Sequence, residues 1–176
     1  MTERTMHYEL LAGKATIESV EVFLHDLDAI ARSSNATIQA VDALKVADRQ
    51  HVDEAARQAL RSFANGHNIA SNLGVEILLH LSACRQIRKA LNLGVHKGEM
   101  DVLFVVVGTT KSIGRSTYRL NHLIVVDPRV IDYREAKRGP LMQIFNITDE
   151  EVEAAGGYDR LPELVRERLA LFDAFK

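Results

Sequence analysis

The chain has 176 residues and a formal net charge of −2, with 22 basic and 24 acidic side chains. Hydrophobic residues make up 47% and charged residues 26% of the sequence, which is typical of a globular protein and excludes a disordered or low-complexity chain. A single cysteine, Cys84, excludes an internal disulfide and a thiolate-rich metal site. With no membrane-spanning apolar run and no signal-peptide pattern, we expect a cytoplasmic protein forming one domain over residues 1–176.

The charge is unevenly distributed along the chain. Residues 1–48 and 139–176 each carry a net charge of −4, residues 49–108 carry +2 and residues 109–138 carry +4. A basic centre permits a local anion-binding face without making the whole protein basic. The alternative is that helices from different blocks interleave their charges on the folded surface, and the sequence leaves both interpretations open.

The first quarter of the chain is predicted to contain two strands and a helix. Residues 5–12 alternate loosely in polarity and are followed by Gly13, which predicts a strand ending there. From Thr16 onward, apolar residues recur at spacings of three and four, which predicts a helix that ends near residues 33–35. Residues 37–43 predict a second, short strand.

An amphipathic helix is the clearest periodic segment. Its apolar stripe covers residues 52–63, and Arg57 and Arg61 lie four residues apart on its polar side. Asn65 and Gly66 are expected to end it. Asn68 is expected to cap a mainly apolar helix over residues 69–83, and a shorter basic helix is predicted over residues 85–91.

The second half of the chain is predicted to add the central strand and further helices. Six apolar residues stopped by Gly108 predict a strand buried on both faces, and residues 122–127 suggest another. Thr148 and Glu151 fit a capping box, and a last helix starts near Pro162. Strands alternating with helices predict an α/β fold, a single domain in which a central mixed β-sheet is packed with several α-helices.

Residues 108–114, GTTKSIG, offer a first candidate site because glycine, lysine and serine follow a buried strand. In a phosphate-binding Walker loop the lysine directly follows the second glycine, whereas Lys111 precedes Gly114 here. We therefore expect a plain surface loop and keep a nucleotide-binding module as the alternative.

Glu76 and His80 form a second candidate because they lie four residues apart on the apolar helix, one turn after Asn72. With Arg85 they suggest a small α/β enzyme, for which Glu76→Gln should abolish turnover without unfolding. A satisfied structural network is the alternative, since a carboxylate on an apolar helix must be paired. The seven histidines show no metal-ligand spacing, and Cys84 is expected to be a small buried residue.

A basic and amide-rich set on the central helices is the third candidate. Arginine forks and helix starts suit phosphates, while amides and hydroxyls suit unpaired bases. A solvated polar face is the alternative. The set comprises Arg57, Arg61, Asn68, Ser71, Asn72, Arg85, Gln86, Arg88 and Lys89.

The central part of the chain, residues 38–108, resembles a known family, the kinase-binding small subunit of the KEOPS tRNA-modification complex. The pattern of residues 144–173 is also similar in outline, whereas residues 109–137 match poorly. The resemblance rests on His51, Ala-Leu-Arg-Ser-Phe (59–63), Asn-Ile-Ala (68–70), Glu-Ile-Leu-Leu (76–79), Arg-Gln-Ile (85–87), Ala90, Gly-Val (94–95) and the following valine-rich strand.

The resemblance implies a non-catalytic α/β subunit without a cofactor. Its partners would be the atypical Bud-family kinase/ATPase of KEOPS, other KEOPS subunits indirectly, and tRNA, especially the single-stranded 3′ end. It would support formation of threonylcarbamoyladenosine in tRNA. On this interpretation RNA meets Arg57, Arg61, Asn68, Ser71, Arg85 and Gln86, and a protein partner meets Ile69, Leu73 and Ile77.

Overall fold

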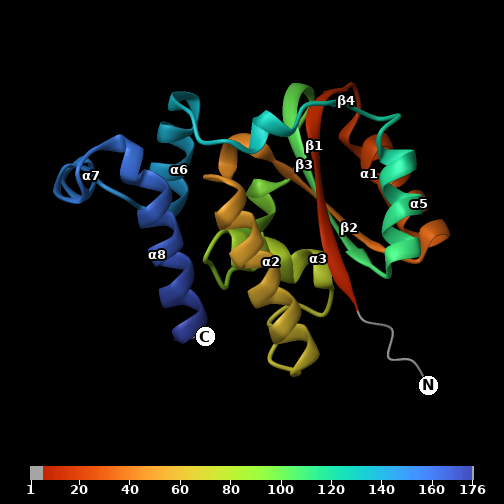
Figure 1. Cartoon of the computed structure of the whole chain (residues 1–176), viewed down its shortest axis with the longest axis horizontal. Helices are drawn as coiled ribbons and strands as arrows, with labels where there is room; N and C mark the ends of the chain where they lie inside the picture. The colour runs from red at the N-terminus through yellow and green to blue at the C-terminus, as the bar shows by residue number, and fades with distance from the viewer. Residues whose placement is uncertain (1–5, 176) are drawn as a thin grey trace. The chain divides into compact units, whose positions relative to one another are not determined.

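The computed structural model describes residues 6–175, and the chain divides into two compact units (Figure 1). Unit 1 is formed by residues 6–43 and 95–130, and unit 2 by residues 44–94 and 131–175. Each unit is therefore assembled from two stretches that are far apart in the sequence. The prediction of one domain over residues 1–176 stays a prediction.

Unit 1 contains a four-stranded sheet in the order β2-β3-β1-β4. The α/β class is confirmed, but the predicted mixed sheet is wrong, because all strand pairs in the described chain are antiparallel. Strands β1 and β2 are parallel to each other, as expected for strands joined by a helix, yet β3 lies between them. The strands are β1 (His7–Ile17), β2 (Thr37–Asp42), β3 (Gly98–Gly108) and β4 (Val125–Val126).

Strand β1 is longer than predicted and does not end at Gly13. It continues to Ile17, so the expected helix start at Thr16 is wrong; Ser19 caps the helix instead, accepting a hydrogen bond from the Val22 N–H at 3.3 Å. A Cβ atom on Gly13 would lie 2.3 Å from the Val125 carbonyl oxygen. This glycine therefore allows the close approach of β4 rather than ending the strand.

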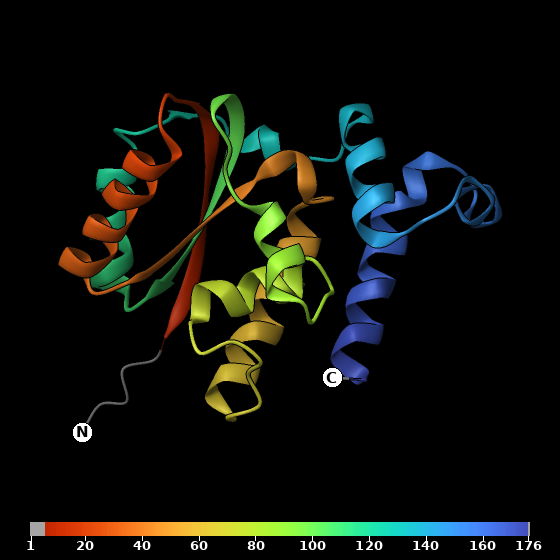
Figure 2. The ribbon, with the colours of Figure 1, turned by 180° about the vertical axis from the view of Figure 1, so that it is seen from behind.

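Helices α1 (Val20–Ser34) and α5 (Thr110–Leu120) lie side by side and pack against the sheet (Figures 1 and 2). Their apolar faces meet alternate residues of β3, including Val102, Phe104 and Val106. Helix α1 contributes Phe23, whose ring stacks on Phe104 at a centroid distance of 6.4 Å. The predicted surface loop at residues 108–114 is wrong, because only Thr109 separates β3 from α5 and caps that helix.

Unit 2 is helical. Helix α2 packs against α3 and α8, and its predicted apolar stripe is confirmed, since Val52, Ala55, Ala56 and Ala59 are fully buried. The helix α6 was not predicted from the sequence. The α-helices are α2 (Arg49–Ala64), α3 (Leu73–Leu81), α4 (Ile87–Ala90), α6 (Arg138–Phe145), α7 (Asp149–Ala155) and α8 (Leu161–Ala174). Short 3-10 helices span Ala43–Lys45, Leu91–Leu93, Pro128–Ile131, Glu135–Lys137 and Tyr158–Arg160.

Two of the helix ends predicted for unit 2 are confirmed and one is wrong. Helix α2 ends at Asn65 with Gly66 in a left-handed conformation at φ 68°, and Thr148 and Glu151 form the predicted capping box of α7. The predicted cap at Asn68 is wrong. Asn72 caps α3 by accepting a hydrogen bond from the Val75 N–H at 3.1 Å, so residues 69–72 precede the helix.

His51 is fully buried and connects the start of α2 to the end of α3 by two hydrogen bonds. Its Nδ1 accepts a hydrogen bond from the Ala47 N–H at 3.0 Å, and its Nε2 lies 2.9 Å from the Leu81 carbonyl oxygen. This pairing requires the neutral ring with the proton on Nε2. Burial lowers the pKa of His51 from 6.5 to about 4, because the charged ring loses its hydration there.

Every helix within residues 6–175 is too short or too polar to cross a membrane.

Candidate functional site

A hollow of 580 Å³ in unit 2 gathers residues from the helices α2 and α8 and from the loops that follow α2 and α3. It contains two of the predicted RNA-binding arginines, Arg61 and Arg85, together with Ile69. We call it the arginine hollow, and its lining residues are Arg61, Ser62, Asn65, His67, Ile69, Arg85 and Asp173.

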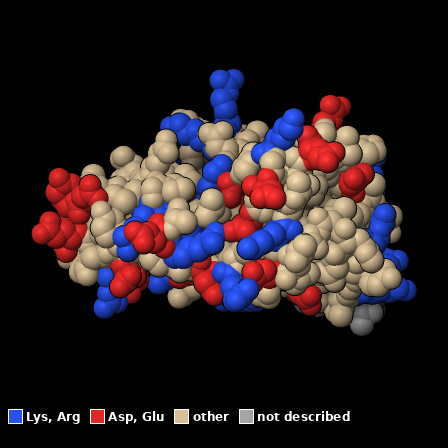
Figure 3. Space-filling model, turned by 90° about the horizontal axis from the view of Figure 1, so that it is seen from above, with Lys and Arg blue, Asp and Glu red and all other residues tan. Residues whose placement is uncertain are grey.

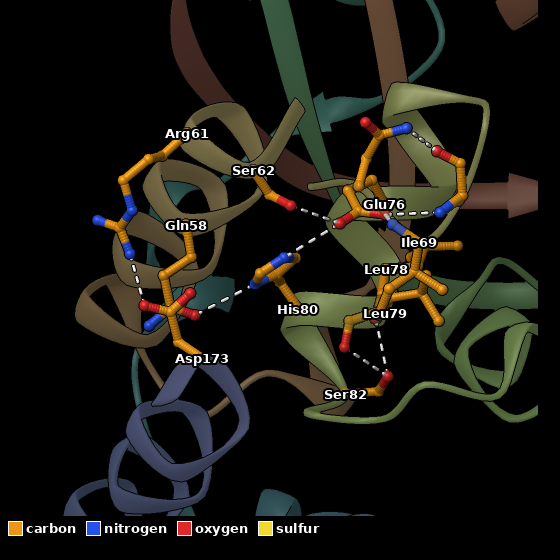
Figure 4. A network of polar contacts seen from close by, with 12 residues as sticks. Gln58, Arg61, Ser62, Ile69, Glu76, Leu78, Leu79, His80, Ser82 and Asp173 are labelled. Atoms are coloured by element: carbon orange, nitrogen blue, oxygen red, sulfur yellow. Dashed lines mark hydrogen bonds and ion pairs between the residues drawn. The ribbon is translucent and has the colours of Figure 1, made fainter. Parts of the chain in front are cut away.

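Both arginines of the hollow are held by the C-terminal end of α8. The Arg61 Nη2 donates to the Asp173 carboxylate at 2.5 Å (Figure 4), and the Arg85 Nη2 donates to the Phe175 carbonyl oxygen at 2.5 Å. Cations near the last carbonyls of a helix are favourable because of the helix dipole. Each guanidinium has five N–H donors, and both side chains are exposed, so they keep the capacity to bind further acceptors.

Beneath the hollow, Glu76 fixes the loop that leads into α3. One carboxyl oxygen accepts hydrogen bonds from the backbone N–H groups of Ile69 at 2.9 Å and Ala70 at 2.8 Å. The other accepts a hydrogen bond from the Ser62 hydroxyl at 3.2 Å (Figure 4). Both N–H groups belong to the loop, since α3 begins only at Leu73 after its cap Asn72. Glu76 thereby sets the shape of the wall that carries Ile69.

His80 extends this network to α2 and α8. Its Nε2 lies 3.3 Å from a Glu76 oxygen and its Nδ1 lies 3.2 Å from the Gln58 oxygen. Its ring meets the Phe172 ring edge to face at 5.1 Å. The hydrogen bonds of this network join α2 to α3 next to Ser62 of the hollow (Figure 4), and the ring contact with Phe172 adds α8.

The alternative of an enzyme with a site at Glu76, His80 and Arg85 is not supported by this arrangement. Glu76 and His80 are both fully buried, so a substrate cannot reach them, and Arg85 is exposed and held by Phe175 instead. Asn72 caps α3 rather than joining the pair. The buried Glu76–His80 pair is thus a satisfied structural network.

The nucleotide-binding alternative lacks the loop that it requires. A phosphate-binding loop needs several residues between strand and helix, whose N–H groups surround the phosphates. Here Lys111 and Gly114 both lie inside α5. Among the described side chains, no group of three or more His, Cys, Asp or Glu is placed to hold a metal ion.

The other predicted RNA-binding residues lie outside the arginine hollow. Arg57 is exposed one turn before Arg61 on α2, and Ser71 and Gln86 are also exposed. Asn68 donates to the Ala70 carbonyl oxygen at 2.8 Å and so stabilises the loop before α3.

The three residues predicted to meet a protein partner differ in exposure. Ile69 is 38% exposed, Leu73 is half-buried, and Ile77 has no exposed surface. Of the three, only Ile69 and Leu73 therefore offer apolar surface to a partner.

Sequence reasoning missed Ser62, Asn65, His67 and Asp173 as members of the hollow. The ridge formed by Arg57 and Arg61 runs toward the end of α2, which places the residues directly after that helix beside Arg61. The position of Asn65 and His67 directly after the helix could therefore have indicated that they lie near Arg61. Nothing in the local sequence links Asp173 to Arg61.

Cys84 lines a second hollow of unit 2, with a volume of 980 Å³. It is half-buried rather than buried as expected, and its sulfur accepts a hydrogen bond from the Gln86 N–H at 3.3 Å. The same hollow is lined by Lys45 and Lys89.

Comparison with known families gives a match over most of the chain. A family model described as kinase binding protein CGI-121 matches residues 17–171. The chain belongs to this family. The resemblance to the kinase-binding small subunit is thereby confirmed, and membership of the CGI-121 family supports a kinase as a partner. The matched range includes every residue of the arginine hollow except Asp173. No curated protein matches the chain.

Proposed function

We propose that this CGI-121 family member is a non-catalytic, cytoplasmic subunit of the KEOPS complex. In this role it binds tRNA through its single-stranded 3′ end, docks on the atypical Bud-family kinase/ATPase and supports threonylcarbamoyladenosine formation. The observation that carries the RNA-binding part is the arginine hollow, where two exposed arginines adjoin an amide, an imidazole and an apolar side chain.

The chemistry of the hollow suits an unpaired RNA end. Arg61 and Arg85 would bind phosphates, and each is held in place by α8. Asn65 and His67 offer hydrogen-bonding groups for base edges, and Ile69 offers apolar surface for a base. The volume of 580 Å³ lies within the range of small-ligand pockets, roughly 300 to 1,000 Å³.

Docking on the kinase would use the apolar surface next to the hollow. Ile69 and Leu73 retain exposed area, and the two surfaces meet at Ile69. We therefore expect Leu73→Glu to weaken capture of the kinase while leaving RNA binding intact, because Leu73 does not line the hollow.

The RNA-binding proposal is tested by reversing the two charges of the hollow. Arg61→Glu with Arg85→Glu should lower affinity for tRNA at least tenfold, and removal of the 3′ terminal nucleotides from the tRNA should have the same effect on the parent protein. Arg57→Glu with Arg85→Glu should also weaken binding, because Arg57 is exposed one turn before Arg61 on α2. Affinity should fall as salt rises, since phosphate contacts release counterions.

Arg49→Glu with Arg160→Glu is the matched control, because both residues are exposed in unit 2 and lie outside the hollow. The parent protein with full-length tRNA is the reference. If the Arg61/Arg85 variant binds full-length tRNA as tightly as this reference, and the parent protein binds the shortened tRNA as tightly, the RNA-binding assignment is wrong.

A further inference from the structure

Unit 1 carries a basic surface that the proposed function does not use. Lys111, Arg115 and Arg119 recur every fourth residue along α5, and all three are exposed. They span about 12 Å along one side of the helix, since each residue adds about 1.5 Å. The helix, TKSIGRSTYRL, contains no acidic residue. We call these three residues together with Tyr118 the α5 stripe.

The two arginines of the α5 stripe are held in place by uncharged partners on α1. The Arg115 Nη2 donates to the Ser34 carbonyl oxygen at 3.1 Å, and the Arg119 Nη1 donates to the Ser33 hydroxyl. Both partners lie at the C-terminal end of α1. Each contact uses one of five guanidinium donors. The arginines are therefore positioned in advance, which lowers the entropy cost of binding an anion.

A hollow with an aromatic edge lies on the α5 stripe. It has a volume of 390 Å³ and is lined by Ser33, Ser34, Gly114, Arg115, Tyr118 and Arg119. Tyr118 is 70% exposed, and its ring meets the His122 ring at 5.4 Å. A Cβ atom on Gly114 would meet nothing within 4 Å, so the surface is open at that point. Exposed aromatic rings beside cations are typical of nucleic-acid contacts.

The α5 stripe is positive in its own right, whereas the neighbouring α1 also carries acidic residues. On α1, Asp28 is paired with Arg32 at 2.5 Å, and Glu21 and Asp26 are two further exposed acidic residues. In the space-filling view, acidic side chains cluster at the end where α7 lies, and others are interspersed with basic side chains over the rest of that face (Figure 3). The block of residues 109–138, which includes α5, carries the highest positive net charge in the chain, +4.

We propose that the α5 stripe binds the sugar–phosphate backbone of RNA and makes a second contact to the tRNA whose 3′ end enters the arginine hollow. This inference rests on the proposed function. A row of cations about one helical turn apart fits a polymer of phosphates better than a single phosphate group. Recognition of this kind is independent of sequence, so the contact would add affinity and orient the tRNA rather than select it.

Two variants test the α5 stripe by tRNA-binding titrations over a range of salt concentrations. Arg115→Glu with Arg119→Glu should lower tRNA affinity about tenfold or more at low salt. It should also reduce the magnitude of the slope of log K against log salt concentration by about 1.5, since each lost phosphate contact reduces that slope by about 0.7 to 0.9. Lys111→Ala with Tyr118→Ala should lower affinity about fivefold. This second variant keeps the hydrogen bonds of both arginines with α1, so it remains informative if the arginine variant folds poorly.

Lys14→Glu with Lys97→Glu is the matched control. Both lysines are exposed in unit 1, and the double variant changes the net charge by the same amount as the double arginine variant. Its tRNA affinity should stay close to that of the parent, which shows that position on α5 matters and not net charge alone.

A short single-stranded oligonucleotide with the sequence of the tRNA 3′ end separates this inference from the proposed function. The α5 variants should bind it like the parent, whereas the Arg61/Arg85 variant should not. If α5 variants bind full-length tRNA with the parent's affinity and salt dependence, the α5 inference is overturned and the arginine hollow is unaffected. If instead only the α5 variants lose tRNA affinity, the α5 inference is supported and the arginine hollow is not the RNA site.

Discussion

The Asp173 carboxylate lies 2.5 Å from a guanidinium nitrogen of Arg61 and joins α8 to α2 across 112 residues of sequence. The Phe175 carbonyl oxygen makes the equivalent contact with Arg85. The last turn of α8 therefore supplies an acceptor to each arginine of the hollow. Arg61 keeps donors for an anion that enters the arginine hollow, but the Asp173 carboxylate competes with that anion for the positive charge of Arg61.

Removing that competition should strengthen RNA binding. Asp173→Asn is expected to raise affinity for a single-stranded RNA end by up to about fivefold, because an exposed ion pair contributes about 1 kcal/mol or less. Fluorescence titration of a labelled oligonucleotide measures the change. Glu167→Gln, which removes one negative charge from an exposed position of the same helix, should change affinity less. Equal effects from both variants would show that general charge, and not the contact with Arg61, is responsible.

Glu76 should be essential for stability because its carboxyl group serves four partners from a fully buried position. Glu76→Ala leaves buried donors without an acceptor and is expected to lower the free energy of unfolding by about 3 to 5 kcal/mol. Glu76→Gln keeps one acceptor oxygen and should cost about 1 to 2 kcal/mol. Urea unfolding measures both values.

The same variants report on the loop before α3. Glu76→Ala should also weaken RNA binding, because Ile69 lines the hollow and its N–H group loses its acceptor. Glu153→Ala, at an exposed position of α7, is the control and should leave both properties unchanged. A Glu76→Ala protein as stable as the parent would contradict the role given to this network.

His51 should make stability depend on pH. Its pKa is about 4 in the folded protein and 6.5 as the ordinary value, so between these values the unfolded chain binds a proton that the folded protein does not. Stability is therefore complete above pH 6.5 and falls as the pH decreases toward 4, by about 3 kcal/mol. Urea unfolding at a series of pH values measures this slope.

His51→Gln removes the titrating ring and should flatten this part of the pH dependence, although the variant is less stable than the parent at pH 7.5. His67→Gln, at an exposed position, should keep the parent's slope. An unchanged slope in the His51 variant would mean that other groups cause the acid sensitivity.

Features set by neighbouring residues could be predicted from the sequence. The stripe of α2, the exposed ridge of Arg57 and Arg61, and the Thr148–Glu151 capping box depend on spacings of three and four residues, and all three are confirmed. The start of α3 could not be predicted this way. Residues 69–72 lie outside the helix although they continue its apolar run, because Asn72 and not Asn68 caps the helix, and local spacing does not distinguish between these two asparagines.

The arginine hollow depends on contacts between distant parts of the chain. Arg61 meets Asp173, and Arg85 meets Phe175 from 90 residues away. The sequence indicated the right kinds of side chain but not which of them share a surface, so Arg57 and Gln86 were grouped with residues that they do not join. The sheet order is a similar case, because β3 pairs between β1 and β2 although the helices α2, α3 and α4 separate it from β2 in the sequence.

Two glycines of unit 1 should respond to the same substitution in opposite ways. Gly13→Ala places a methyl group 2.3 Å from the Val125 carbonyl oxygen, so β4 must move away from β1, and we expect a loss of about 1 to 3 kcal/mol in the free energy of unfolding. Gly114→Ala adds a methyl group to an open position inside α5 and should stabilise the protein by about 0.5 to 1 kcal/mol, because alanine favours a helix over glycine. Urea unfolding of both variants under identical conditions gives the comparison. Destabilisation of similar size at both positions would contradict the close approach of β4 as the reason for Gly13.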